Sequence, residues 1–404
     1  MLRPNFFNYA TKESSQDAII CWLIDCINSE DENYRIIGES FIRNFVFNGS
    51  EGKIQLLQEH PNKQYSSIDV FTYVKKGNLV YPIIFENKTE SFLHSKQFEN
   101  YCVKVTGWMK KKKIDNCEWG DILYILFKTG YLYDFQISLF DKQSEEVKHL
   151  IHPINIEPKI KNINDMICFL ESLDPLVYKE IDIMSDYLMF LKQQLIIQNE
   201  SFDNWNSEDR EMQRKSYSIH VGQVLLFECA FNVDASKFYF GYDSSNYLCY
   251  SVWKDREHEI NCEEDNQQER IYNTINYLFR FDERVNQHRE TDKNGNSIKD
   301  YCFIFQQYRK EKDTQDINGF VKKELSVLRS KKYESMHSKV KLIIEKISEQ
   351  KFAIEVDYKE ANQNNMDSRE LFRIFVNEKN KPKNVCAFIR EFISEFQKEF
   401  NEEK

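Results

Sequence analysis

The chain has 404 residues, of which 41% are hydrophobic and 30% are charged, and its formal net charge is −10 at pH 7. These values are typical of a soluble globular protein with two or three domains, and they exclude a collagen-like or largely disordered chain. No apolar run approaches the length of a membrane span, and the first residues lack a signal-peptide core. The ten cysteines form no CxxC pair. We therefore expect a cytoplasmic protein without a structural zinc site or a membrane partner.

The first third of the chain shows an alternation of helical and extended patterns. Residues 13–28 and 34–47 have the apolar spacing of two helices. Residues 67–90 then predict a β-hairpin, because two apolar, β-branched runs flank the polar turn KKGN. A helix over 94–110 and a strand over 121–131 follow. This order predicts an α/β core.

The pattern changes after about residue 150 and becomes that of a helix-rich α+β region. We therefore divide the chain into a first domain, 1–150, and a second region, 151–404. The expected elements of the second region are helices within 160–231, including 174–197, a hairpin over 237–253, helices over 270–281, 320–347 and 384–400, and strands over 301–308, 352–358 and 371–377.

Three polar residues of the predicted hairpin are spaced in a way that suggests chemistry. Asp69 lies in the first strand, and Glu86 and Lys88 lie two residues apart in the second. Since strand side chains alternate between faces, Glu86 and Lys88 point the same way and Asn87 points away. Two carboxylates can hold a hard divalent cation, and a nearby lysine can orient or polarise a water molecule.

This spacing resembles the D…(D/E)xK core of the PD-(D/E)XK nuclease superfamily, with Ile68 in place of the usual proline. Gln97 and Tyr101, four residues apart, resemble the QxxxY element of its RecB-like members. The resemblance covers about residues 8–135. It implies a central mixed sheet flanked by helices, and a Mg²⁺- or Mn²⁺-dependent deoxyribonuclease of the kind that often serves in restriction or defence against phage.

The resemblance also implies roles for individual residues. The catalytic residues are Asp69, Glu86 and Lys88. The metal is held by Asp69, Glu86, the backbone carbonyl of Asn87 and Glu13, which would begin the first helix. The nucleic-acid backbone contacts Gln97 and Tyr101.

Lysines that follow the QxxxY element are further candidates for phosphate contacts. Residues 1–133 hold 16 basic and 16 acidic residues, so the net acidic charge lies entirely in the rest of the chain. Within this neutral part, lysines near phosphates give affinity that is independent of sequence. The alternative for the lysine run is a solvated basic loop. The candidates are Lys104, Lys110, Lys111, Lys112 and Lys113.

Other interpretations remain open at this point. Glu86 and Lys88 could form a surface ion pair, although a charge at the end of a buried strand is costly unless it is paired or metal-bound. The chain could also be a non-catalytic nucleic-acid- or protein-binding regulator that retains a nuclease-like fold. DNA is the expected partner, and RNA is not excluded. The region 151–404 could recognise a partner, form a homodimer or cover the nuclease cleft.

Overall fold

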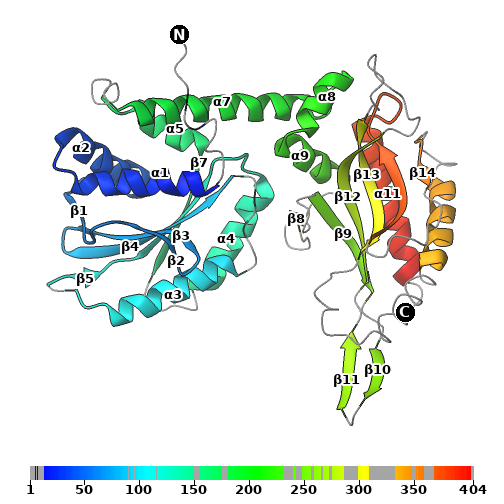
Figure 1. Ribbon diagram of the computed structural model, residues 1–404, viewed down its shortest axis with the longest axis horizontal. Coiled ribbons are helices and arrows are strands. Elements are labelled where there is room, and N and C mark those ends of the chain that lie inside the picture. Colours follow the sequence, from blue (N-terminus) through cyan, green and yellow to red (C-terminus); the bar gives the residue numbers. More distant parts are fainter. Residues whose placement is uncertain are drawn as a thin grey trace. The chain divides into compact units, whose positions relative to one another are not determined.

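The computed structural model describes residues 5, 7, 13–89, 91, 93, 96–114, 116–148, 155–174, 181–231, 240–242, 248–255, 259–264, 267–272, 275–285, 299–308, 333–347, 352, 354–358 and 368–401 (Figure 1). The chain forms two compact units, 1–199 and 200–404, which are described in turn. No helix in the described ranges is both long enough and apolar enough to cross a membrane.

The first unit is built from one sheet and helices on both of its faces. Its helices are α1 (Glu13–Asp25), η2 (Cys26–Asn28), α2 (Glu32–Phe41), η3 (Ile42–Val46), α3 (Gln97–Lys111), α4 (Asp134–Lys148), α5 (Ile163–Glu171) and α7 (Asp182–Asn204), the last of which ends in the second unit. Its strands are β1 (Ile54–Leu56), β2 (Asn62–Tyr65), β3 (Ile68–Lys76), β4 (Leu79–Lys88), β5 (Glu118–Trp119), β6 (Ile122–Lys128) and β7 (Ile156–Asn162).

The sheet is mixed, as predicted. Its main order is β1-β3-β4-β6-β7, with β2 beside β3 and β5 beside β4. Strands β3 and β4 are antiparallel, whereas β4, β6 and β7 are parallel. The predicted hairpin is thus confirmed, and its turn contains Gly77 at φ 63°, in the left-handed region that glycine enters without a steric penalty.

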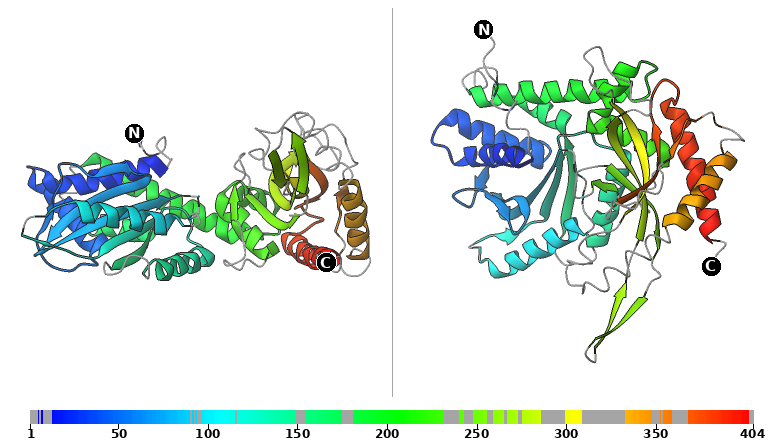
Figure 2. Two further views of the ribbon diagram at one scale, coloured as in Figure 1. Left: turned by 90° about the horizontal axis from the view of Figure 1, so that it is seen from below. Right: turned by 45° about the vertical axis from the view of Figure 1, so that its right-hand side comes forward.

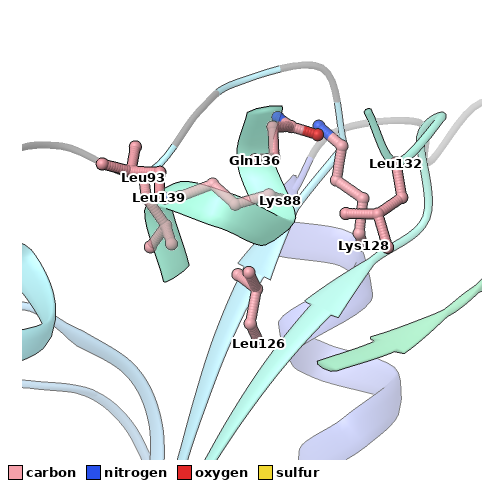
Figure 3. A pocket seen from close by; sticks show the side chains of 7 residues that line it. All are labelled: Lys88, Leu93, Leu126, Lys128, Leu132, Gln136 and Leu139. Atoms are coloured by element: carbon pink, nitrogen blue, oxygen red, sulfur yellow. The ribbon is translucent and has the colours of Figure 1, made fainter. Parts of the chain in front are cut away.

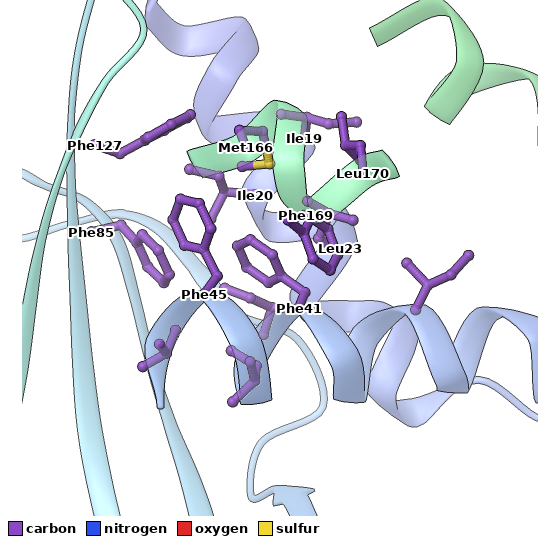
Figure 4. Close-up of a cluster of buried hydrophobic side chains, with 14 of the residues drawn as sticks. Ile19, Ile20, Leu23, Phe41, Phe45, Phe85, Phe127, Met166, Phe169 and Leu170 are labelled. Carbon is purple, nitrogen blue, oxygen red and sulfur yellow. The ribbon is translucent and has the colours of Figure 1, made fainter. Parts of the chain in front are cut away.

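Each face of this sheet has its own hydrophobic core. Figures 1 and 2 show α1 and α2 on one face and α3 and α4 on the other. On the first face, Phe41 of α2 stacks on Phe85 of β4 with ring centroids 6.0 Å apart, within the cluster of Figure 4. On the second face, the ring centroids of Phe98 of α3 and Tyr124 of β6 are 4.1 Å apart. Burying a Phe side chain stabilises a fold by about 1.5–3 kcal/mol, so these two layers hold the strand ends in place.

Three expectations drawn from the sequence need correction. Among the described residues of 352–358, the expected strand is formed only by Asp357–Tyr358. The first unit extends beyond the predicted boundary at residue 150, because β7 pairs with β6 in the same sheet and α5 packs on it. The segment 270–281, expected to be helical, instead forms the end of β11 and most of β12. Its apolar residues are compatible with a helix or with a strand, and pairing with neighbouring strands stabilises the strand.

The second unit contains helices and antiparallel strands, in agreement with the predicted α+β class. Its helices are α8 (Arg210–Tyr217), α9 (His220–Phe231), the helical residues 333–347 and α11 (Pro382–Asn401). Its strands are β8 (Phe240–Tyr242), β9 (Leu248–Asp255), β10 (Glu259–Glu264), β11 (Gln267–Tyr272), β12 (Ile275–Val285), β13 (Lys299–Tyr308), β14 (Asp357–Tyr358) and β15 (Ser368–Phe375).

Aromatic side chains form the core of the second unit. Its larger sheet has the order β14-β15-β13-β12-β9-β8, and β10 pairs with β11. Phe231 of α9 stacks on Tyr250 of β9 with ring centroids 3.9 Å apart. The ring centroids of Phe279 of β12 and Phe392 of α11 are 6.0 Å apart. The predicted hairpin over 237–253 is confirmed by the pairing of β8 with β9. The regulatory, targeting or oligomerisation role of this region stays a prediction.

Candidate active site

Two carboxylates lie side by side where β3 begins and β4 ends. Val70 pairs with Phe85, so Asp69 and Glu86 are neighbours across the hairpin. Glu86 is fully buried and Asp69 is half-buried. The backbone N–H of Asn87 donates to Asp69 Oδ2 at 2.8 Å. This bond ties the start of β3 to the end of β4 and holds the two acids together.

Helix α3 brings the QxxxY residues to the same place. Gln97 begins the helix, and its Nε2 donates to Glu86 Oε1 at 2.6 Å and to the Tyr101 hydroxyl at 3.0 Å. The Tyr101 hydroxyl in turn donates to the carbonyl of Ser67. Residues four apart on a helix share a face, and here that face meets the end of the hairpin. The expected proximity of Gln97 and Tyr101 to Glu86 is therefore present.

The electrostatics at Glu86 are unusual for a carboxyl group. The pKa of Glu86 is raised to about 8, mainly by burial, with Lys88 opposing the rise and the neighbouring Asp69 adding to it. Lys88 forms an ion pair with Oε1 of Glu86. The other oxygen, Oε2, is buried and receives no hydrogen bond from the described residues. A buried carboxylate oxygen without a donor is costly unless a proton or a cation reaches it.

These features fit a divalent cation. Mg²⁺ is commonly held by one or two carboxylates and completes its shell with water and substrate phosphates, and Asp69 and Glu86 supply two such groups. The described residues contain no cluster of three or more acidic, histidine or cysteine side chains suited to a metal. The predicted metal ligands Asp69, Glu86, the Asn87 carbonyl and Glu13 therefore all stay predictions.

Helix α1 contributes an acid that the sequence did not single out. Glu13 begins α1, but its side chain lies outside the described residues. Asp17, one turn later, is buried, and its Oδ1 accepts a hydrogen bond from Asn87 Nδ2 at 2.5 Å. Asn87 points to the α1 face and Glu86 to the α3 face, as the alternation predicted. Asp17 therefore holds the end of β4 from the α1 side of the sheet. The sequence feature that could have indicated this role is its position four residues after Glu13.

A second buried lysine was also missed. Lys128 ends β6, is only 2% exposed and lies directly opposite Lys88 in the β4–β6 register. Both lysines line a pocket of about 10 Å³ with Gln136 and leucines of β6, α4 and the neighbouring loops (Figure 3). The sequence feature that could have indicated Lys128 is its place at the end of the apolar run ILYILFK, which resembles the place of Lys88 at the end of IIFENK.

The other predicted lysines separate into two groups. Lys104 lies near the site, since its ammonium donates to Ser66 O at 2.5 Å, next to the carbonyl that Tyr101 binds. The run Lys110–Lys113 is exposed at the opposite end of α3, about 20 Å along the helix axis from Gln97. The structure does not bring this run to the acids.

Comparison with known proteins gives no evidence on the function of this chain. We found no matching family model, no matching curated protein and no matching solved structure. The case for a nuclease therefore rests on the sequence pattern and on the geometry described above.

Proposed function

We propose that the chain is a metal-dependent nuclease that hydrolyses phosphodiester bonds in DNA through a PD-(D/E)XK-type site in its first unit. The observation that carries the proposal is the convergence of Asp69, Glu86, Lys88 and Gln97 at one end of the β3–β4 hairpin. A surface ion pair explains it poorly, because Glu86 is fully buried and Lys88 is 8% exposed.

Each residue of the site has a separate role in the proposed reaction. Asp69 and Glu86 would hold Mg²⁺ or Mn²⁺, which when bound supplies Lewis-acid polarisation of the phosphate and of a water molecule. Lys88, paired with Glu86, lies where an ammonium group can orient the attacking water and offset negative charge on the phosphate oxygens. Gln97 fixes the orientation of the Glu86 carboxylate, and Tyr101 fixes Gln97.

A cleavage assay with isosteric variants tests the proposal. The full chain is incubated with single-stranded DNA, duplex DNA and RNA in Mg²⁺, in Mn²⁺ and in EDTA. We expect metal-dependent cleavage of DNA that Asp69→Asn abolishes. Asp141→Asn, the same chemical change at an exposed position of α4, serves as the matched control and should cleave like the wild type.

The outcomes separate the nuclease from the alternatives. Cleavage of RNA alone would change the substrate and keep the mechanism. Binding of nucleic acid without cleavage under any metal condition would reject the nuclease and favour a non-catalytic regulator. Equal cleavage by wild type and Asp69→Asn would show that another site, or a contaminant, does the cutting.

A further inference from the structure

Two cysteines meet where α9 contacts α11 in the second unit. Sγ of Cys386 on α11 lies 3.6 Å from the carbonyl oxygen of Leu226 on α9. A helical carbonyl points along the helix axis towards the following turn, and the turn that follows Leu226 carries Cys229. The Cys386 thiol is also within hydrogen-bonding distance of the Cys229 side chain. The two sulfur atoms are therefore neighbours across the two helices.

Arg390 makes a second contact between α11 and the same turn of α9. Its Nη1 donates to the carbonyl of Cys229. Cys386 and Arg390 are four residues apart, so they share one face of α11, and that face meets Cys229. Packed helix axes lie about 8–10 Å apart with Cα atoms about 2.3 Å from each axis, so facing Cα atoms can come within the span of about 4.4–6.8 Å that a disulfide needs. This helix pair is therefore compatible with a disulfide.

The two thiols differ in exposure and in acidity. Cys229 is partly exposed, whereas Cys386 is fully buried. The hydrogen bond from Cys386 and the nearby Arg390 guanidinium lower the pKa of Cys229 to about 6, and burial raises the pKa of Cys386. Cys229 is therefore the thiolate at pH 7, which is the form that reacts with an oxidant. An accessible thiolate beside a second cysteine is the arrangement of thiols that sense oxidants.

We propose that Cys229 and Cys386 form a peroxide-sensitive dithiol that oxidises to a disulfide between α9 and α11. The Cys229 thiolate attacks one oxygen of hydrogen peroxide, the O–O bond breaks, and a sulfenic acid forms as hydroxide leaves. The Cys386 thiol then attacks this sulfur, the S–O bond breaks, and the departing hydroxide takes the thiol proton to form water. Two thiols are thus oxidised to one disulfide while one hydrogen peroxide is reduced to two water molecules. The proposal is independent of the nuclease function.

Peptide mapping of the full chain after treatment with hydrogen peroxide at pH 7 tests this dithiol. The remaining thiols are alkylated, and we expect a peptide that joins Cys229 to Cys386 and that dithiothreitol separates. Cys168→Ser, at an exposed cysteine of α5, is the matched control and should give the same linked peptide. In Cys386→Ser, Cys229 should stop at the sulfenic acid, which dimedone labels. In Cys229→Ser, Cys386 should stay a thiol.

Thermal unfolding gives a second readout. The disulfide would join segments that are far apart in the sequence, and closing a long loop restricts the unfolded chain. We expect peroxide to raise the melting temperature of the second unit by about 5 °C or more, and dithiothreitol to reverse the rise. The same treatment should leave the melting temperature of Cys386→Ser without this rise.

The outcomes decide for or against the dithiol. Absence of the linked peptide after peroxide treatment of the wild type, or a link from Cys229 to a different cysteine, would overturn the proposal. An equal yield of dimedone-labelled Cys229 in the wild type and in Cys386→Ser would show that Cys386 does not resolve the sulfenic acid. Should Cys386→Ser fail to fold, Cys386→Ala carries the same tests. A failed nuclease assay leaves all of these results unchanged.

Discussion

Gln97 on α3 donates a hydrogen bond of 2.6 Å to Oε1 of Glu86 on β4. The same amide nitrogen donates to the Tyr101 hydroxyl, which is anchored on Ser67 at the start of the hairpin. Helix α3 is thus joined to the end of β4 through the buried Glu86 carboxylate, and to the residue before β3 through the Tyr101 hydroxyl. The amide therefore orients the carboxylate that we propose as a metal ligand.

Replacement of Gln97 should weaken the site without destroying it. Loss of a group that orients a metal ligand typically costs 10–100-fold in metal affinity or activity. We therefore expect Gln97→Met to lower Mg²⁺ affinity or cleavage by about that factor, and less than Asp69→Asn does. Metal titrations of cleavage rate provide the measurement. Asn100→Met, at an exposed position of the same helix, should have no such effect. Identical metal titrations for both variants would show that Gln97 does not orient the metal ligand.

Glu86 should make the metal-free protein less stable as the pH rises. Its pKa, about 8 in the folded state, exceeds the ordinary value of 4.5, mainly because of burial. Between these values the unfolded chain gives up the proton first, so the free energy of unfolding falls as the pH rises towards 8. Thermal unfolding in EDTA at pH 5, 6, 7 and 8 should show this loss, on the order of a few kcal/mol.

Glu86→Gln provides the control for that pH dependence. The variant cannot titrate at this position, so its stability should fall less over the same pH range. Added Mg²⁺ should stabilise the wild type most strongly at pH 8, where the carboxylate is available to bind it. Parallel pH profiles for wild type and variant would show that Glu86 titrates normally.

Gly130 should be intolerant of any side chain. A Cβ atom at this position would lie 1.8 Å from the backbone oxygen of Thr89, so the segments that follow β4 and β6 would have to separate. Thr129 N donates to Lys88 O at 3.0 Å across this same contact. We expect Gly130→Ala to reduce the free energy of unfolding by about 1–3 kcal/mol, the usual cost of overpacking, and to reduce cleavage.

Gly107 supplies the matched control. It lies within α3, and a Cβ atom there would meet nothing within 4 Å. Gly107→Ala should therefore stabilise the protein by up to about 1 kcal/mol, since alanine is the better helix former. Denaturant unfolding of both variants measures the two effects. A Gly130→Ala variant as stable as wild type would mean that the strand ends are not held as close as described.

Cys229 should be the more reactive thiol in a comparison with Cys21, which is also partly buried. A hydrogen bond from Cys386 and the nearby Arg390 guanidinium lower the pKa of Cys229 to about 6, whereas burial raises the pKa of Cys21 to about 12. The thiolate is the nucleophile, so Cys229 should be alkylated faster by iodoacetamide at pH 7, as measured by peptide mapping. Arg390→Met should slow the labelling of Cys229. Faster labelling of Cys21 would contradict the assignment.

Local patterns in the sequence predicted the hairpin and the residues that lie on it. Alternating apolar residues and the KKGN turn placed Glu86 and Lys88 on one face, and the i, i+4 spacing placed Gln97 and Tyr101 on one side of a helix. These features depend on the fixed periods of strands and helices, which neighbouring residues alone express. The order of these elements indicated an α/β core, and the resemblance to the PD-(D/E)XK superfamily implied the mixed sheet flanked by helices.

Contacts between distant segments were decided only by the tertiary structure. Lys128 faces Lys88 because β6 pairs with β4 in one particular register, and a change of register by one residue would turn the lysine to the other face. Asp17 reaches Asn87 only because α1 packs behind β4. The extent of the first unit depends on β7 joining β6. Such pairings depend on the packing of whole faces against each other, and no local period of the chain records them.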